Sequence, residues 1–453
     1  MNIKSKYNDF SMIDEVAIVL YAITYHYIGG HTLFHKNEQI YPEFSSYVLG
    51  GEYILPSNIN NFNFIQSIDN NIEIFDIANA LEKVIEKLLN LTNTNKISLS
   101  LTGGFDSRIL LSILKKMDVE LHCYTYGNPS SIDCIIAKEI AETLRIPHCI
   151  YDVKFNAESF YNAAEESIKL GEGLCSLHRA HRIEAIKKES EFSETMFLGT
   201  MGGEFIKGAN HDDYIISNFV FEYANHPDIE TIKKYMKIRG LVPYDKLAEK
   251  VKEVMDEQSY IKNKDNMELY ALIDIAAKLH HGQNFIHYRH FFPNIFTPYC
   301  DIDYLNILFS SKYNFLYRRK NQSSAKFKLE NPRFGSLMQY YLNKSLANIP
   351  YSNGFSAKEY LISPYYAFLK AKYRKFRKKT LPNFSLGKWM EEFVVNNLNS
   401  IIESESILNK YFDIHLLLKE LDQPNLPKDE PFWLKYTCPV QIFLTQKIFG
   451  YKE

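Results

Sequence analysis

The chain has 453 residues, a formal net charge of −2 at pH 7, and 46% hydrophobic against 23% charged residues. This composition excludes an intrinsically disordered chain, and the near-neutral charge excludes a global attraction to nucleic acid or anionic membranes. The length exceeds what one ordinary core supports, so we expect three parts, 1–93, 94–330 and 331–453.

The segment 1–93 is predicted to be a small α+β cap without chemistry of its own. Residues 12–28 have the pattern of a helix that ends at Gly29 and Gly30, and short strands are expected between 32 and 56. Apolar residues at helical spacing predict a further helix over 75–91, which leads the chain into the next part.

The stretch Lys96–Ser107, KISLSLTGGFDS, has the pattern of a strand, a glycine loop and the start of a helix. The two glycines let backbone N–H groups approach an anion closely, and the positive N-terminus of the following helix points to the same place. Hydroxyl donors at Thr102 and Ser107 and a carboxylate at Asp106, which can hold Mg²⁺, suit a pyrophosphate with its metal. No Walker-type G-x-x-x-x-G-K-[ST] motif occurs.

Strands and helices then alternate, which predicts an α/β fold with a doubly wound parallel sheet. Strands are expected at 120–127, 148–153 and 195–198, with helices at 132–144, 157–170 and 176–188. Ligands of such sheets bind outside the carboxyl ends of the strands. Three loops should therefore meet at one edge: Thr102–Ser107, Tyr126–Asp133 and Gly199–Gly208.

The third loop, GTMGGEFIKG, repeats the chemistry of the first, because small residues after a strand are followed by one carboxylate, Glu204. If Glu204 faces Asp106 across the edge of the sheet, the two side chains complete a Mg²⁺ site on a triphosphate. The alternative is a glycine-rich turn with a solvated glutamate.

Together these loops resemble the synthetase domain of the asparagine synthetase family, which includes β-lactam synthetases and lasso-peptide cyclases. LTGGFDSR resembles the family's SGGLDSS pyrophosphate loop, and YGNPSSIDCIIAKEIAETL resembles VGLPGSPDLKAAQEVANHL. GTMGGEFIKG resembles SGEGSDELFGGY, TPYCD at 297–301 resembles VPFLD, and IGGHTLFHKNEQIYP resembles the end of the glutaminase domain that precedes the synthetase domain. The resemblance covers about residues 25–360.

The resemblance implies an adenine-nucleotide α-hydrolase type of sheet, with a short N-terminal remnant and a helical C-terminal portion, that binds ATP and Mg²⁺. Leu101 and Tyr126 would frame the adenine, Gly199 and Thr200 would line the ribose, and Asp106 and Glu204 would be the catalytic metal ligands. The remaining cofactor-binding residues implied are Thr102, Gly103, Gly104 and Ser107 at the pyrophosphate, and Gly127, Ser131 and Asp133 in the second loop.

Three departures from the family pattern stand out. Asn2 follows Met1 where the glutaminase has its nucleophile, so we expect no glutamine hydrolysis. Met201 occupies the acid/base position of the third loop, and Asn294 occupies the position of its partner carboxylate. The run IPYSNGF at 349–355 lacks the family's lysine, and Lys207, Lys326, Lys328 and Lys358 do not replace it unambiguously.

The expected function is an ATP-dependent ligase that adenylates a carboxylate and passes the acyl group to ammonia or an amine. The acid would be a small molecule, a peptide or a saccharide. One alternative is a nucleotide-binding partner protein that has lost acyl transfer. Another is a tRNA-modifying enzyme, which the absence of paired cysteines disfavours.

The six cysteines are scattered without CxxC pairs, and no apolar run reaches the roughly 18 residues of a membrane helix, so a cytoplasmic protein without a membrane span is expected. The pairs His178 with His181 and His287 with His290 have a spacing that can bind zinc, but no third ligand is evident, and the arginines beside them suggest an anion-facing wall.

Helical spacing dominates after residue 331, and helices are expected over 334–347, 357–379, 387–402, 407–421 and 431–449. The basic run RRKNQSSAKFK at 318–328 is predicted to be a solvated loop. Lys370–Lys379 contains seven basic residues interleaved with Tyr373 and Phe376. Such a run is usually a solvated helix face, but it can also grip an anionic ligand such as a carbohydrate, RNA phosphates or acidic lipid headgroups.

Overall fold

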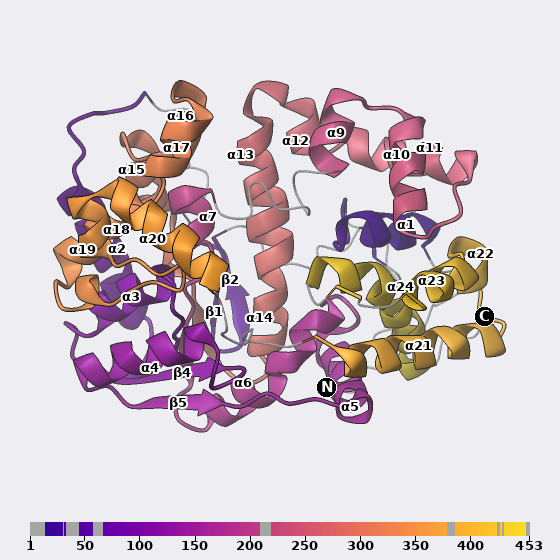
Figure 1. Cartoon of the computed structure of the whole chain (residues 1–453), viewed down its shortest axis with the longest axis horizontal. Helices are drawn as coiled ribbons and strands as arrows, with labels where there is room; N and C mark the ends of the chain where they lie inside the picture. The colour runs from indigo at the N-terminus through magenta and orange to yellow at the C-terminus, as the bar shows by residue number, and fades with distance from the viewer. Residues whose placement is uncertain are drawn as a thin grey trace.

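The computed structural model describes residues 14–29, 31–32, 45–57, 67–208, 219–377, 386–423, 426–427 and 430–449. A sheet with its helices occupies one half of the molecule, and a helical assembly occupies the other (Figure 1). The part of the expected strand region from 33 to 44, and the first two residues of the helix expected over 12–28, lie outside the described residues.

The sheet has seven strands in the order β2-β1-β7-β6-β3-β4-β5. The strands are β1 Tyr47–Leu49, β2 Glu52–Ile54, β3 Lys96–Ser100, β4 Glu120–Tyr126, β5 His148–Tyr151, β6 Thr195–Phe197 and β7 Asn294–Phe296. The strands from β7 to β5 are parallel, whereas β1 pairs antiparallel with both β7 and β2. The parallel part confirms the predicted α/β fold class.

The hairpin of β1 and β2 extends the sheet. Leu49 pairs with Glu52, which leaves Gly50 and Gly51 as a two-residue turn with φ values of 59° and 85°. Two positive φ values in a row are typical of the type I′ turn, which suits glycine and matches the twist of the flanking strands. Part of the segment predicted to be a cap therefore forms the edge of the main sheet.

Helices cover both faces of the sheet, because alternate strand residues enter two separate buried clusters. Leu99, Phe197 and Phe296 face the larger cluster, which contains α2, α3 and α15. Their neighbours Met196 and Ile295 face a smaller cluster with residues of α6 and α14. A period of two in side-chain direction, with apolar residues on both sides, is typical of a doubly wound sheet.

The helices of the sheet half follow the chain order. They are α2 Ile74–Leu89, α3 Asp106–Leu114, α4 Ile132–Leu144, α6 Ile183–Ser190, α7 Gly202–Lys207, α15 Ile302–Ser310, α16 Phe315–Asn321, α17 Ser324–Glu330, α18 Arg333–Leu342, α19 Ala357–Ile362 and α20 Pro364–Arg377. Helix α5, Ala157–Gly171, instead lies with the helical half (Figure 1). Short 3₁₀ helices lie at Leu177–Arg182, Pro298–Cys300 and Leu346–Asn348. α18 packs on α2 and α3, so the segment just after residue 330 contacts the sheet half.

The helical half contains elements from both ends of the chain (Figure 1). They are α1 Glu15–Thr24, α9 Phe219–Asn225, α10 Ile229–Ile238, α11 Asp245–Asp256, α12 Ser259–Lys262, α21 Lys388–Glu403, α22 Leu408–Tyr411, α23 Ile414–Leu421 and α24 Glu430–Phe449. In the described ranges, none of the helices is both long and apolar enough to cross a membrane.

A continuous helical segment, Met267–Tyr288, stands between the halves (Figure 1). It consists of α13 Met267–Ala271, a π-helical stretch Leu272–His281 and α14 Gly282–Tyr288. π-Helix is rare and often occurs at functional sites, because the extra residue in each turn changes which side chains face a neighbour. Here the π-helical stretch ends in His280 and His281.

Three sequence-based expectations about helices need correction. The basic run at 318–328 is not a solvated loop but lies in α16 and α17, where Arg318 is buried and donates to the Ile206 carbonyl. The helix expected over 176–188 begins as a 3₁₀ turn. The helix expected over 357–379 divides before Pro364, because a proline disfavours α conformation in the residue that precedes it.

Candidate active site

The strand order places a topological switch point between β3 and β6. From β3 the chain runs through β4 to β5 on one side, while β6 and β7 lie on the other. The crevice at the carboxyl ends of two strands whose connections diverge is the usual ligand site of such sheets. The loops that begin at Leu101 and at Leu198 follow these two strands, and the loop at Tyr126 follows the neighbouring β4.

The glycine loop of β3 is folded around its own polar groups. The Thr102 N–H donates to Ser107 Oγ at 3.1 Å, and the Gly104 N–H donates to Thr102 Oγ1 at 3.3 Å. The Gly103 N–H donates to Asp133 Oδ1 at 3.1 Å. A carboxylate oxygen thus already accepts a hydrogen bond from this loop, which shows that its backbone can bind an anion.

The first and third loops are packed directly against each other. A Cβ atom on Gly199 would lie 3.1 Å from Ser107 N, and a Cβ atom on Gly202 would lie 2.9 Å from both Cβ and Cγ of Asp106. Both glycines are therefore needed for this close approach. The contact places the Asp106 side chain at the start of α7, whose first turn carries Glu204. The two predicted metal ligands come from touching loops.

Glu204 is 7% exposed, and its Oε1 lies 3.4 Å from His281 Nε2. His281 comes from the π-helical stretch, nearly eighty positions later in the sequence. Sequence reasoning missed His281, because the KLHHGQNF run in which it lies has no spacing that indicates a partner. The central helix therefore contributes a titratable side chain to the edge of this site.

Tyr299 holds the start of α3 in place through a hydrogen bond to its first residue. Its hydroxyl donates to the Asp106 carbonyl at 2.8 Å, and its ring would clash with a Cβ atom on Gly202 at 2.8 Å. Burial raises the pKa of the Tyr299 phenol well above its usual value, so the group is a neutral donor. The sequence indicated the TPYCD strand end but not this role for its tyrosine.

The residues predicted to frame the nucleoside are held by the sheet. The Leu101 side chain is fully buried, its N–H donates to the Tyr124 carbonyl, and its own carbonyl accepts from Thr125 Oγ1. The Tyr126 ring is half-buried with its centroid 5.5 Å from that of His181. Thr200 is half-buried beside Gly199.

In the second loop, Gly127 has a φ of 127°, a conformation that requires glycine. Its N–H donates to the Tyr151 carbonyl. Ser131 caps α4 by accepting from the Cys134 N–H. These contacts bring Asp133 to the Gly103 amide and fix the second loop beside the first.

The chain matches the family model of asparagine synthase over residues 77–268, a range that contains all three loops. Residues 77–268 are therefore similar to an asparagine synthase domain. A search of curated proteins returns no match. A solved structure of NMN synthetase from Francisella tularensis is similar at 14% identity over 48% of this chain and 94% of its own, with a TM-score of 0.24, which is too loose for a comparison of sites.

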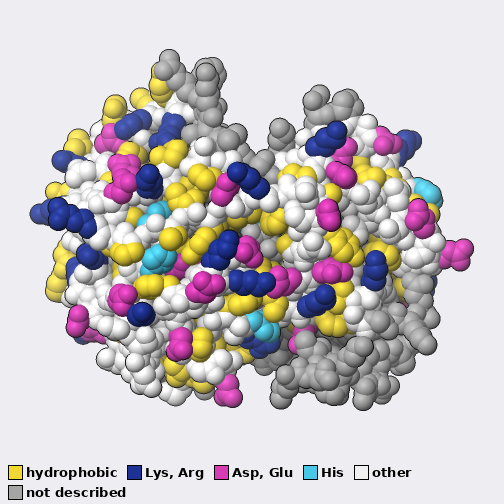
Figure 2. Space-filling view, turned by 90° about the horizontal axis from the view of Figure 1, so that it is seen from below, with side chains coloured by type: hydrophobic (Ala, Val, Ile, Leu, Met, Phe, Trp, Pro, Cys, Tyr) yellow, Lys and Arg dark blue, Asp and Glu magenta, His cyan; other side chains and the backbone are white. Residues whose placement is uncertain are grey.

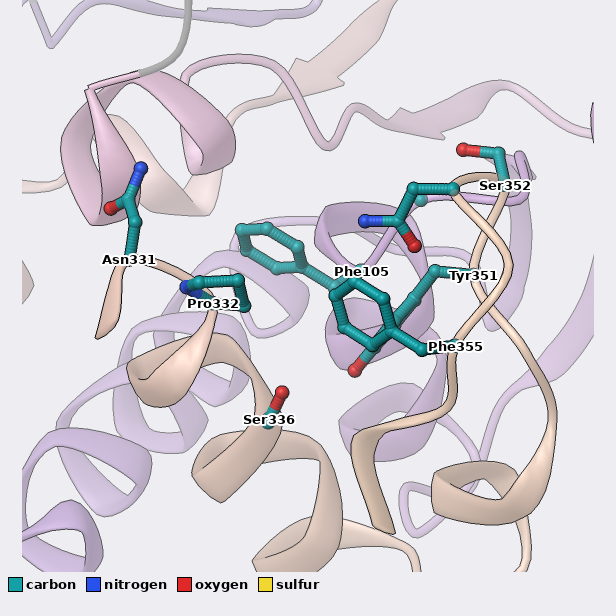
Figure 3. Close-up of a pocket in the computed structure, with 9 residues that line it drawn as sticks. Phe105, Asn331, Pro332, Ser336, Tyr351, Ser352 and Phe355 are labelled. Atoms are coloured by element: carbon teal, nitrogen blue, oxygen red, sulfur yellow. The ribbon is translucent and has the colours of Figure 1, made fainter. Parts of the chain in front are cut away.

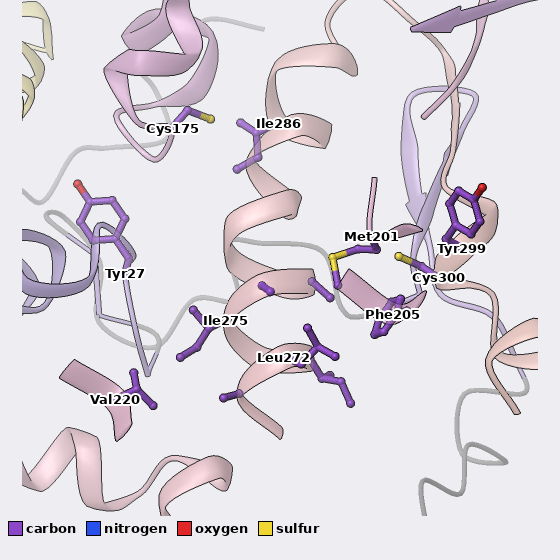
Figure 4. Close-up of a cluster of buried hydrophobic side chains, with 14 of the residues drawn as sticks. Tyr27, Cys175, Met201, Phe205, Val220, Leu272, Ile275, Ile286, Tyr299 and Cys300 are labelled. Carbon is purple, nitrogen blue, oxygen red and sulfur yellow. The ribbon is translucent and has the colours of Figure 1, made fainter. Parts of the chain in front are cut away.

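Met201 and Asn294, the two residues predicted to occupy acid/base positions, have structural contacts in this fold. Met201 has a φ of 68° and is fully buried, and it lies with Phe205 and Cys300 in the apolar cluster beside the central helix (Figure 4). Asn294 begins β7, at the opposite end of the strand from the site, where it donates to Thr195 Oγ1 and accepts from the Gly50 N–H. Met201 belongs to the third loop, but its side chain is part of the hydrophobic core, and Asn294 lies away from the three loops.

Arg108 ties the turn 349–355 to the glycine loop that follows β3. The buried guanidinium donates to the carbonyls of Ile349 at 2.7 Å, Pro350 at 3.1 Å, Gly103 at 3.3 Å and Leu346 at 3.4 Å. The Tyr351 ring lies over it at 4.5 Å. Burial lowers the pKa of Arg108 to about 10, so it remains charged at neutral pH. It brings a fixed positive charge behind the glycine loop.

We expect Arg108→Leu to destabilise the protein by roughly 2–4 kcal/mol, because several buried carbonyls lose their donors and each such loss costs about 1–3 kcal/mol. The stability of Arg108→Lys should lie between those of the wild type and Arg108→Leu, because one ammonium group cannot donate to all four carbonyls. Urea denaturation measures the difference, with Arg333→Leu at an exposed position of α18 as the control. Equal stability of the two leucine variants would contradict a stabilising role for the hydrogen bonds that Arg108 makes to the buried carbonyls.

A pocket of about 130 Å³ opens beside the loop, between the turn 351–355 and the start of α18. The rings of Phe105, Tyr351 and Phe355 form its apolar wall, and Ser336 points its hydroxyl into the space (Figure 3). Gly104 belongs to its lining, so the pocket adjoins the predicted pyrophosphate site.

The donor set fits Mg²⁺ better than zinc. Among the described residues no three His, Cys, Asp or Glu side chains gather as a metal site. His287 Nε2 lies at Ser167 Oγ and His290 Nε2 at the Leu170 carbonyl, which does not support the zinc interpretation. Mg²⁺ is commonly held by one or two carboxylates together with phosphate oxygens, and Asp106 and Glu204 offer such a pair.

Proposed function

We propose that this chain is an ATP- and Mg²⁺-dependent ligase that adenylates a carboxylate and transfers the acyl group to ammonia or a substrate amine. The observation that carries the proposal is the contact of the Asp106 side chain with Gly202, on an asparagine synthase domain, at the switch point of the sheet. The backbone amides and Asp106 of the first loop, together with Glu204 of the adjoining third loop, would therefore surround a triphosphate.

In the first half-reaction a carboxylate oxygen of the acid attacks the α-phosphorus of ATP. The new P–O bond forms as the bond to the β-phosphate oxygen breaks, and pyrophosphate leaves. The amides of Gly103 and Gly104, the hydroxyls of Thr102 and Ser107 and the N-terminus of α3 would bind the pyrophosphate. Asp106 and Glu204 would hold Mg²⁺, which supplies charge stabilisation on the phosphate oxygens.

In the second half-reaction the amine nitrogen attacks the acyl carbon, the bond to the AMP oxygen breaks, and the amine loses a proton. The acid/base residues that serve this step in the family are replaced here by Met201 and Asn294. The Met201 side chain is buried, and Asn294 lies at the far end of β7. His281, beside Glu204, is the side chain that we propose receives the proton.

The replacement of these two acid/base residues also favours a second candidate function, a nucleotide-binding partner protein that does not transfer an acyl group. Fully buried Met201 supports it. Adenylation of tRNA remains a third, weaker proposal. The three candidates differ in what stimulates pyrophosphate exchange.

The test is ATP–pyrophosphate exchange with panels of amino acids, peptides and uronic acids. We expect at least one acid to stimulate exchange, and its subsequent incubation with ammonia or amines to release AMP. ATP binding without exchange for any acid would support the partner protein. Exchange with tRNA alone would support the modifying enzyme.

A further inference from the structure

Helix α20 presents a row of large apolar side chains to solvent. Tyr365 is 71% exposed, Leu369 64% and Tyr373 57%, and they follow each other at intervals of four residues. Tyr366 belongs to the same face, and Phe368 and Ile362, at the end of α19, are exposed beside it. Side chains four apart form one continuous stripe on a helix, and such stripes rarely face solvent without a function.

The stripe is not a consequence of a loosely placed helix. Ala367, on the opposite face, is fully buried, and Ala371 packs against the main core. Lys370 forms an ion pair with Glu359 of α19, and α20 contacts both α17 and α19. Small residues thus attach the helix to the body, while its large apolar residues are exposed. Helix α20 itself lies on the near side of the sheet half (Figure 1).

Cations flank the stripe on both sides. At 100° per residue, Lys370 and Arg374 lie on one side of it and Lys372 on the other. The Lys372 Nζ lies 4.9 Å from the Phe368 ring, and the stem of Arg374 packs over Gly354. Among the described residues neither Lys372 nor Arg374 has an acidic partner.

The charge pattern of α20 differs from that of the chain as a whole. Acidic and basic side chains are interspersed over the face in Figure 2. The whole chain carries a net charge of −2, yet residues 364–379 contain basic residues and no acidic ones. The predicted anion-binding run Lys370–Lys379 thus begins on α20, although its side chains from 375 to 379 lie outside the described residues.

We propose that the exposed face of α20 docks on an anionic membrane surface, with the helix axis parallel to the surface. An apolar stripe with aromatic residues, flanked by cations that extend to headgroup phosphates, has the chemistry of an interfacial helix. Leu369 and Ile362 decide between lipid and the other anionic ligands, because RNA and carbohydrate offer no apolar interior for aliphatic side chains. This inference does not depend on the proposed ligase activity.

The experiment is sedimentation of the full chain with vesicles of phosphatidylcholine alone or with 30% phosphatidylglycerol. We expect binding to the anionic vesicles, weakened when salt is raised from about 0.1 to 1 M because the screening length shrinks from about 10 to 3 Å. Leu369→Glu/Tyr373→Glu should reduce the partition coefficient at least about tenfold. Lys372→Glu/Arg374→Glu should reduce it by more than about fivefold per position.

The matched control is Lys237→Glu/Ile238→Glu, which makes the same kinds of change on α10, where Ile238 is also exposed. It should bind like the wild type, and all variants should keep the wild-type thermal midpoint and ATP binding. Absence of vesicle binding by the wild type would overturn the proposal. So would a dimer in solution that the Leu369→Glu/Tyr373→Glu variant abolishes, because the stripe would then be an interface between copies.

Discussion

Asp106→Asn is expected to lower ATP–pyrophosphate exchange by at least about a hundredfold while the protein stays folded. Removing one preorganised electrostatic contact to the reacting phosphates typically costs about 10²–10³ in rate. The substitution keeps the shape of the side chain, which matters because Asp106 lies against Gly202 without spare room. The Tyr299 hydrogen bond to this residue uses the backbone carbonyl, so it should persist in the variant.

Asp118→Asn, at an exposed position after α3, is the matched control and should exchange like the wild type. Glu204→Gln should resemble Asp106→Asn if both carboxylates hold one Mg²⁺, and the magnesium concentration for half-maximal exchange should rise in both variants. Undiminished exchange in Asp106→Asn would refute the assignment of the loop.

The second large effect is loss of stability in mild acid. Burial lowers the pKa of His26, His181 and His287 to about 3, and it lowers that of His280 well below its usual value. The cations Arg179 and Arg182 act in the same direction on His181, His280 and His287. All four side chains are therefore neutral in the folded protein throughout the physiological range.

In the unfolded chain these imidazoles titrate near 6.5, so below that pH the unfolded state binds more protons and the free energy of unfolding falls. Each group contributes a slope of about 1.4 kcal/mol per pH unit, or about 2 kcal/mol by pH 5. The summed loss from four such groups approaches the whole free energy of unfolding of an ordinary domain, about 5–15 kcal/mol.

Urea midpoints at pH 7.5, 6 and 5 would measure this effect, and a steep fall is expected between pH 6 and 5. His287→Gln should flatten the slope by about one proton, whereas the exposed His415→Gln should leave it unchanged. A midpoint that stays constant from pH 7.5 to 5 would contradict the buried neutral histidines.

The parallel sheet and the meeting of its loops were predictable because strand alternation and glycine loops are local features of the sequence. What the sequence could not provide were contacts made by single side chains across long separations. His281 reaches Glu204 from a π-helical stretch, and Arg108 binds carbonyls about 240 residues away. Whether a basic residue is solvated or buried likewise depends on the partner surface, as Arg318 shows.

The hydrogen bond from the Gly103 amide to Asp133 has a consequence for how a nucleotide enters the site. The tethered carboxylate has a high effective concentration at this amide, so an incoming phosphate must compete with it. A single phosphate or sulfate ion makes too few other contacts to displace the Asp133 carboxylate from the Gly103 amide. A pyrophosphate unit that engages several amides and hydroxyls at once can do so, and we therefore expect the loop to favour nucleoside triphosphates over simple anions.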